Sequence, residues 1–444
     1  MKKSMAIICS LILVIFFSVS SFASDELGET EEWELGDVTV GGDIRIQGIA
    51  TKNVTDLEDD IYKPQEVDLD NSEFLRHRTR VWLDVDLWDD ARAYIRLAAE
   101  PTWGIPDESL SIEHLIVIDN SYIQLSELFG TPVSVRFGRQ DLAYGEGFLV
   151  KEGTPADESR TSYFDAIKIS ADLGYSTTGD IFAAKINENW KQDVYYGVSR
   201  DDEDLYGIYL TNKYLKDHHA ELYGLHREHL HMNTTAIGLR VSGKIIAPLS
   251  YGAEYAQQFG KYNGRLTLSD FVEQDADRNA WGWYGHASYQ PDLPFKPLFK
   301  LGCYMTSGDD RGTSDTYEQW DSFYSEWPKY SELYLYTNQD HFSYEGLDTE
   351  EGAWGNMLIL EAKASVEPIE DLTVTLKECI FRANEENGPG DGSNRGNNPQ
   401  LLIGYKLTDN VSTSLLGEYF LPGDYYAEEA DNAYLTQFQL YARF

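Results

Sequence analysis

Cysteine is scarce in this sequence of 444 residues, which contains three. Cys9 falls in the N-terminal segment, and Cys303 and Cys379 fall on predicted strands that we place two apart. Two strand spacings are about 9.6 Å, which exceeds the roughly 7 Å limit for a disulfide. The sequence therefore predicts two free thiols and no disulfide framework.

Basic residues are also scarce, since 36 lysines and arginines stand against 75 aspartates and glutamates, for a net charge of −39. This charge argues against nucleic acid as a partner, because nucleic-acid binding depends on neutralising phosphates with lysine and arginine. The mean hydropathy is −0.43, and no later segment reaches the roughly 20 apolar residues of a transmembrane helix. A helical membrane protein is therefore not expected.

Catalytic motifs are lacking too. The sequence shows no nucleophile with its base and orienting group, and no paired carboxylates at a loop rim. Gly145-Glu146-Gly147 is not a phosphate loop, because the remaining glycine and a following helix are missing. We therefore expect no enzymatic activity and no cofactor.

The N-terminus has the pattern of a secretory signal peptide. Met1-Lys2-Lys3 is followed by an apolar run over 5–19 and by the small residues of Ser21-Phe22-Ala23. A basic start, a short apolar segment and a small-x-small site are typical of export signals. We predict a signal peptide over 1–23, cleavage before Ser24, and a short periplasmic segment over 24–36.

Aromatic residues are abundant, with 30 Tyr, 19 Phe and 10 Trp. Apolar and polar residues alternate over many short segments, and the C-terminal one places Phe438 and Leu440 on the same face as the final Phe444. Low mean hydropathy, alternating strands and aromatic girdles are typical of outer-membrane barrels. The sequence predicts an all-β protein, a single antiparallel transmembrane β-barrel over 37–444.

The alternation predicts about eighteen strands. Their expected spans are 37–50, 73–87, 91–100, 117–125, 132–141, 162–172, 179–187, 204–214, 219–228, 234–245, 248–259, 280–290, 296–306, 356–367, 371–383, 399–408, 411–421 and 433–444.

Short and long connections alternate between these strands. Those after even-numbered strands are tight, as at Asp409-Asn410, whereas most others are long, as at 142–161, 260–279 and 307–355. Short periplasmic turns and long outer loops are the pattern of outer-membrane barrels. We expect both termini in the periplasm and the barrel in the outer membrane of a Gram-negative bacterium, in contact with its lipid and lipopolysaccharide.

The same alternation assigns charged residues to the lumen. On the second strand Val81 and Leu83 must face lipid, because arginine at mid-bilayer costs about 2–4 kcal/mol. This parity turns a set of basic residues inward: Arg45, Arg76, Arg78, Arg80, Arg92, Arg96, Arg136, Lys168, Arg240, Lys244, Lys300, Lys363 and Lys406. The inward carboxylates are fewer: Asp84, Asp86, Glu254, Glu361 and Glu418.

A basic wall with scattered carboxylates favours the passage of anions. On this assignment, most acidic residues of the protein lie in the loops. The alternative is that arginine–aspartate ladders brace the wall of a weakly selective or general porin. A structural conduit around a periplasmic partner is a third interpretation, which no sequence feature favours.

Three motifs resemble the alginate export family of outer-membrane porins. They are Gly138-Arg139-Gln140, Phe164-Asp165-Ala166 (where the family usually has Gly in the third position) and Ser307-Gly308-Asp309. Arg76-x-Arg78-x-Arg80 also fits, and the resemblance covers most of the chain after the signal peptide. It implies an eighteen-stranded monomeric barrel with an arginine-lined conduit for an acidic polysaccharide such as alginate. It adds Arg139 to the lumen, which requires a bulge at Gly138.

Three further groups are candidates for binding. The loop 307–355 is rich in aromatic residues that either bind saccharides or pack into the barrel mouth: Tyr317, Trp320, Phe323, Tyr324, Trp327, Tyr330, Tyr334, Tyr336, Phe342 and Tyr344. His226, His229 and His231 could bind a metal, although solvated histidines are the simpler interpretation. Asp309, Asp310 and Asp315 could bind Ca²⁺ in a loop. The identity of any metal stays open.

Overall fold

The computed structural model describes residues 36–54, 57, 71–88, 90–103, 116–151, 164–187, 203–229, 232–266, 273–310, 312–313, 315–325, 330–334, 354–388, 390–426 and 430–444. The predicted signal peptide 1–23 and all but the last residue of the predicted segment 24–36 lie outside this part of the chain.

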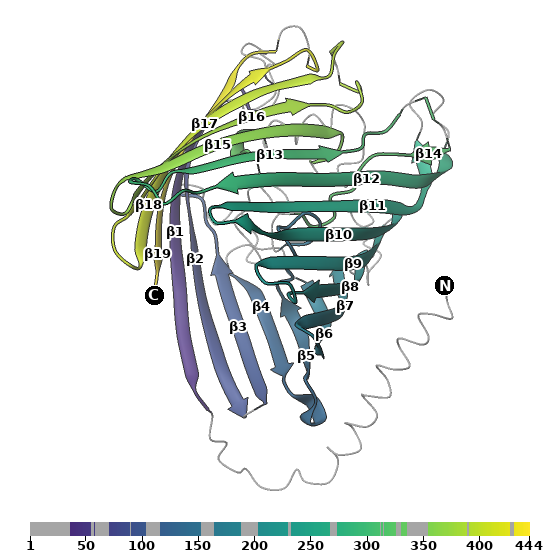
Figure 1. The fold of residues 1–444 in the computed structure, drawn as a ribbon, viewed down its shortest axis with the longest axis vertical. Helices are drawn as coiled ribbons and strands as arrows, with labels where there is room; N and C mark the ends of the chain where they lie inside the picture. The colour runs from purple at the N-terminus through teal and green to yellow at the C-terminus, as the bar shows by residue number, and fades with distance from the viewer. Residues whose placement is uncertain are drawn as a thin grey trace. The chain divides into compact units, whose positions relative to one another are not determined.

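Eighteen antiparallel strands form a closed wall, as the sequence predicted. Each pairs with its neighbours along the chain, and β1 pairs with both β2 and β19, which closes the barrel (Figure 1). The strands are β1 (Val38–Lys52), β2 (Asn71–Trp88), β3 (Ala91–Ala99), β4 (Val117–Leu125), β5 (Val133–Gln140), β6 (Phe164–Gly174), β7 (Thr177–Asn187), β8 (Glu203–Asn212), β9 (His218–His229), β10 (Met232–Ile246), β11 (Leu249–Leu266), β12 (Glu273–Tyr289), β13 (Leu298–Thr306), β15 (Met357–Ile369), β16 (Leu372–Arg382), β17 (Asn394–Lys406), β18 (Val411–Pro422) and β19 (Ala433–Arg443).

Two short elements accompany the wall. The two-residue strand β14 (Thr316–Tyr317) pairs in parallel with β12, and a short 3₁₀ turn, η3 (Leu128–Gly130), lies between β4 and β5. Among the described residues, no helix has the length and apolar character needed to span a membrane.

The predicted loop 260–279 is mostly strand in the structure. β11 continues to Leu266 and β12 begins at Glu273. Polar residues such as Lys261 and Asp277 lie opposite each other on these extensions, so the segment has the composition of a loop while it keeps strand pairing.

Apolar side chains cover the outer face of the wall. Val81 and Leu83 on β2 are 43% and 37% exposed, and Ile95 and Leu97 on β3 are 37% and 41% exposed. In a transmembrane barrel such residues contact lipid, so their exposure in an isolated chain is expected. The residues between them in the sequence point into the lumen.

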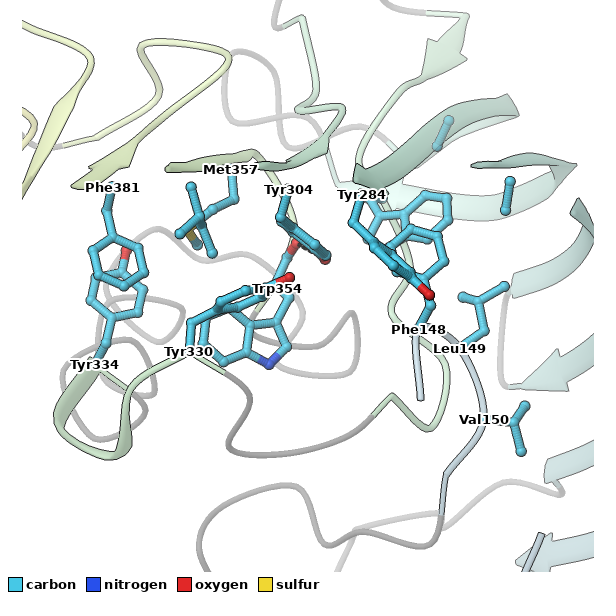
Figure 2. Close-up of a cluster of buried hydrophobic side chains, with 14 of the residues drawn as sticks. Phe148, Leu149, Val150, Tyr284, Tyr304, Tyr330, Tyr334, Trp354, Met357 and Phe381 are labelled. Atoms are coloured by element: carbon cyan, nitrogen blue, oxygen red, sulfur yellow. Dashed lines mark hydrogen bonds between the residues drawn. The ribbon is translucent and has the colours of Figure 1, made fainter. Parts of the chain in front are cut away.

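The hydrophobic core lies inside the barrel, where long connections pack against the inner face of the wall. Phe148 and Trp320 come from two of these connections and are at most 2% exposed. Figure 2 shows Phe148 beside Tyr284 of β12, and the ring of Tyr334 stacked on Phe381 of β16. These aromatic contacts fix the connections against one part of the wall.

Cys303 and Cys379 are free thiols, as predicted. They lie on β13 and β16, with β15 between them. Cys379 is fully buried, and its thiol lies 3.7 Å from the carbonyl oxygen of Tyr330 inside the barrel.

Candidate pore-lining site

The predicted arginine ladder of β2 faces the lumen and converges on one aspartate. Arg78 Nη2 and Arg80 Nη2 lie 3.5 and 2.8 Å from the carboxylate of Asp43 on β1. Asp43 is 1% exposed and was not predicted as a lumen residue, although it has the same parity as Arg45. One carboxylate therefore contacts two guanidinium groups of the ladder.

The same region holds two more of the predicted arginines. Arg45 Nη2 lies 3.5 Å from Glu100. Arg76 Nε donates a hydrogen bond of 3.2 Å to the neutral side chain of Gln47. Both arginines are in register with the ladder across β1 and β2.

Arg92 on β3 is bound by Asp84, through Nε at 2.5 Å and also through Nη2. Asp86 lies opposite Arg92 in the β2–β3 register and is exposed. The two predicted carboxylates, Asp84 and Asp86, thus lie beside Arg92, near the tight turn between β2 and β3.

Arg96 is neutralised by residues that the sequence did not reveal. Its Nε donates to Asp119 at 2.5 Å, and its Nη2 donates to Asp141 at 3.1 Å. The β3–β4 register shifts between Arg96 and Leu97, which lets Asp119 and Asn120 both become buried. Simple alternation would turn Asp119 outward, so only the β-bulge reveals its role.

Arg136 on β5 contacts neutral groups. Its Nε and Nη2 donate to Gln124 Oε1 at 3.0 and 2.7 Å, and its guanidinium carbon lies 4.4 Å from the ring centroid of Tyr122. In the described part of the chain no carboxylate lies within ion-pair distance of Arg136.

Lys168 on β6 lies opposite Arg136 in the register. Its Nζ is 2.7 Å from Asp180 and 5.1 Å from the ring centroid of Tyr144. Tyr144 also donates to Asp180 at 2.9 Å, and burial is the largest cause that raises the pKa of this phenol. Tyr144 belongs to the connection after β5, so this connection reaches the inner wall.

Glu146 holds the same connection to β10 and β12. Its carboxylate lies 2.8 Å from Arg240 Nη2 on β10 and 2.9 Å from His286 Nε2 on β12. Burial alone would raise the pKa of Glu146, but hydrogen bonds from His286 and Arg240 outweigh it and lower the pKa to about 2. Arg240 also pairs with Glu221 at 2.7 Å and lies 3.9 Å from Glu254, one of the predicted carboxylates.

A second connection is held by a buried ion pair that the sequence did not predict. Arg227 of β9 donates to Asp321 at 3.0 Å and to Glu203 at 2.9 Å. All three are at most 7% exposed. This part of the wall therefore carries more carboxylates than the parity argument counted, and they anchor loops.

Lys244 lies on β10, and the other remaining predicted residues lie on β13–β18. Lys300 pairs with Glu361 at 2.9 Å. Glu418 accepts hydrogen bonds from Ser331 Oγ at 2.5 Å and from the backbone N–H of Glu332 at 3.0 Å, so it also holds a connection. Lys406 is the last residue of β17 and pairs with Asp409 of the following turn at 2.7 Å, so it lies at the end of the wall.

A family model for alginate export matches residues 67–438 of the sequence. The chain belongs to the alginate export family. Among curated proteins, none matches this family member by sequence.

Solved porin structures share the fold of this alginate export family member. OccK11 (OpdR) of Pseudomonas aeruginosa aligns with a TM-score of 0.59 at 9% identity, covering 93% of this chain and 98% of that one. OccK2 (OpdF) of the same organism, solved with glucuronate, aligns with a TM-score of 0.56 at 11% identity, covering 92% of this chain and 98% of that one. The outer membrane protein OpdK of P. aeruginosa aligns with a TM-score of 0.55 at 10% identity, covering 91% of this chain and 98% of that one. Family and fold together make the chain an outer-membrane channel protein.

The prediction that Arg139 of the family motif lines the lumen is wrong. Arg139 lies opposite Asp165 in the β5–β6 register and makes two hydrogen bonds to its carboxylate, of 2.8 and 2.9 Å. It shares the outer face with Phe137, which is 37% exposed. Gly138 has a φ of 119° but the pairing there is continuous. No residue is inserted, so the alternation carries Arg139 outward.

The candidate metal ligands are dispersed in this alginate export family member. His226 accepts or donates a 2.8 Å hydrogen bond with Thr235 on the outer face, whereas His229 lies 3.9 Å from Glu203 on the inner face. A spacing of three along a strand gives opposite faces. His231 lies outside the described residues. Asp309 and Asp310 accept backbone N–H groups of Glu318 and Gly312, and in the described ranges no three His, Cys, Asp or Glu residues cluster as a metal site.

The described aromatic residues of the connection 307–355 are buried or partly buried. Tyr317, Trp320 and Tyr334 are at most 4% exposed, as the packing interpretation predicts. Tyr324 and Leu149 of the other inward connection pair through a 2.8 Å backbone hydrogen bond. Trp327, Tyr336, Phe342 and Tyr344 lie outside the described residues.

Proposed function

We propose that this outer-membrane channel passes anionic solutes passively, along the wall formed by β1–β5. The observation that carries the proposal is the row of arginines on the inner face of that wall. Asp43 is shared by Arg78 and Arg80, and Arg136 lies against neutral partners. Charges in a narrow lumen with low-dielectric walls act more strongly on ions than screened loop charges do.

The substrate class that we propose is an anionic small solute or an acidic polysaccharide such as alginate. Membership of the alginate export family supports the polysaccharide. The structural neighbour OccK2, solved with glucuronate, supports a carboxylated sugar. We further propose that the protein acts as a monomer without a cofactor or enzymatic activity, and that the apolar outer face binds membrane lipid and lipopolysaccharide.

Selectivity tests the proposal directly. The reversal potential of the purified channel in a tenfold KCl gradient should show anion preference, and Arg76→Gln with Arg136→Gln should reduce the anion-to-cation permeability ratio by about two- to fivefold. Arg139→Gln is the matched control, because it removes an arginine of the same strand from the outer face, and it should leave the ratio unchanged.

A general porin is the second candidate, because most inward arginines have a carboxylate partner. Cation preference in the unaltered channel, or an equal effect of Arg139→Gln and of the paired lumen variant, would replace the anion proposal with this one.

A further inference from the structure

Two tyrosines form a stacked pair on the inner wall beside Arg136. Tyr94 of β3 and Tyr122 of β4 are direct register partners, with ring centroids 5.2 Å apart and ring planes 21° apart. Their sequence neighbours Ile95 and Ile123 are 37% and 50% exposed on the outer face. The tyrosines therefore point into the lumen.

The stacking is offset, since parallel rings in full overlap would have closer centroids. Offset stacking leaves part of each ring uncovered, and both tyrosines are indeed only partly buried. Most other lumen tyrosines differ in this respect: Tyr209, Tyr223 and Tyr284 are 3–5% exposed. The Tyr94–Tyr122 pair thus offers apolar ring surface to a passing solute.

Arg136 extends this stack by one member, with its guanidinium over the ring of Tyr122. Two of the N–H groups of Arg136 bind Gln124, whereas a guanidinium has five to offer. Arg92 lies one strand from Gln124 in the same register row. A carboxylate at this place would meet a guanidinium that no carboxylate of the described residues neutralises.

The wall is flat next to the pair. The register partner of Tyr122 on β5 is Gly138, and that of Gly138 on β6 is Ala166. The amide of Gln140 donates to the carbonyl oxygens of both, at 3.1 and 2.9 Å. On the β5 and β6 side of Tyr122, this row therefore carries no large side chain among the described residues.

We propose that Tyr94, Tyr122 and Arg136 form a subsite for a carboxylate carried on a ring, a uronate sugar or an aryl acid. The apolar face of the ligand ring packs on the tyrosines, and its carboxylate binds Arg136. This inference rests on the proposed function. It adds that the subsite distinguishes ring-shaped from open-chain carboxylates, which charge alone does not do.

Glucuronate and gluconate separate shape from charge, because both carry six carbons and one carboxylate and only glucuronate closes into a ring. Block of single-channel current should show glucuronate binding about five- to tenfold more tightly than gluconate, a size of effect typical of one aromatic contact. Tyr94→Leu with Tyr122→Leu should bring the two solutes to within about twofold of each other. Arg136→Gln should weaken both solutes together.

Two matched variants control the test. Tyr94→Phe with Tyr122→Phe keeps the rings and should keep the discrimination. Tyr405→Leu changes a tyrosine that is 41% exposed on the outer face and should have no effect. Equal block by both solutes in an anion-selective channel would overturn the subsite alone. Cation selectivity of the unaltered channel would overturn the proposed function, and discrimination that survives the leucine substitutions would place the ring contact elsewhere.

Discussion

At the scale of single residues, strand parity is the strongest guide to position. It places Arg78 and Arg136 inside, where the structure has them. It fails at Asp119, because a bulge turns an extra residue inward. Parity gives the correct outward position for Arg139, which the family motif had led us to predict in the lumen. The contact partners, such as Gln124 for Arg136, could not be predicted, because they depend on the register between strands.

The two thiols allow a test of parity. Cys303 is part-exposed and Cys379 is buried beneath Tyr330. In the folded protein in detergent, a maleimide should label Cys303 and leave Cys379 unmodified, and unfolding without reductant should expose both. Mass spectrometry gives the stoichiometry. Labelling of Cys379 in the folded state would show that the connection around Tyr330 does not cover it.

At the scale of elements, the strands could be predicted because each must alternate apolar and polar residues to face lipid and lumen. The inward connections could not. Glu146 is 94 positions from Arg240 and 140 from His286, and no local pattern marks such partners. The aromatic composition of 307–355 indicated packing without showing which wall receives it.

The ionic anchor of the first connection gives a prediction at this scale. Glu146→Gln removes the ion pair with Arg240 and changes the hydrogen bond with His286, and allowing for the part exposure of Glu146 this should cost about 1 kcal/mol of local stability. Hydrogen exchange of the amides of Tyr144 and Gly147, which bond within the connection, should then quicken about fivefold.

Glu228→Gln is the control for this experiment, because Glu228 pairs with His226 on the outer face. In Glu228→Gln, hydrogen exchange of the amides of residues 142–150 should match that of the unaltered protein. Unchanged exchange in Glu146→Gln would mean that the packing of Phe148 and the backbone pairing to Tyr324 suffice to hold the connection.

At the scale of the whole molecule, closure was predictable from the even number of strands and from the amphipathic last strand, which pairs with the first. The distribution of charge was only partly predictable. The net charge of −39 suggested carboxylates in the loops, yet the inner wall of β8–β12 holds the buried carboxylates of Glu203, Glu221 and Glu254.

Closure predicts how the protein behaves in detergent. The chain should migrate faster on a gel in unheated dodecyl sulfate than after boiling, because a sheet without free edges resists unfolding. It should also fractionate with outer membranes. Recovery as a soluble periplasmic protein, with one mobility at all temperatures, would contradict the barrel.

The pair Arg139–Asp165 has a consequence for how the barrel sits in its membrane. A second outer-face pair, Lys185–Asp204 at 3.2 Å, lies at the same end of the wall, next to long connections. Sliding the barrel by one residue moves these charges about 3.3 Å along the strand direction, and arginine or lysine at the bilayer midplane costs about 2–4 kcal/mol. The pairs therefore set a limit on insertion depth, so that a thicker bilayer would have to thin around β5–β8 rather than draw the protein further in.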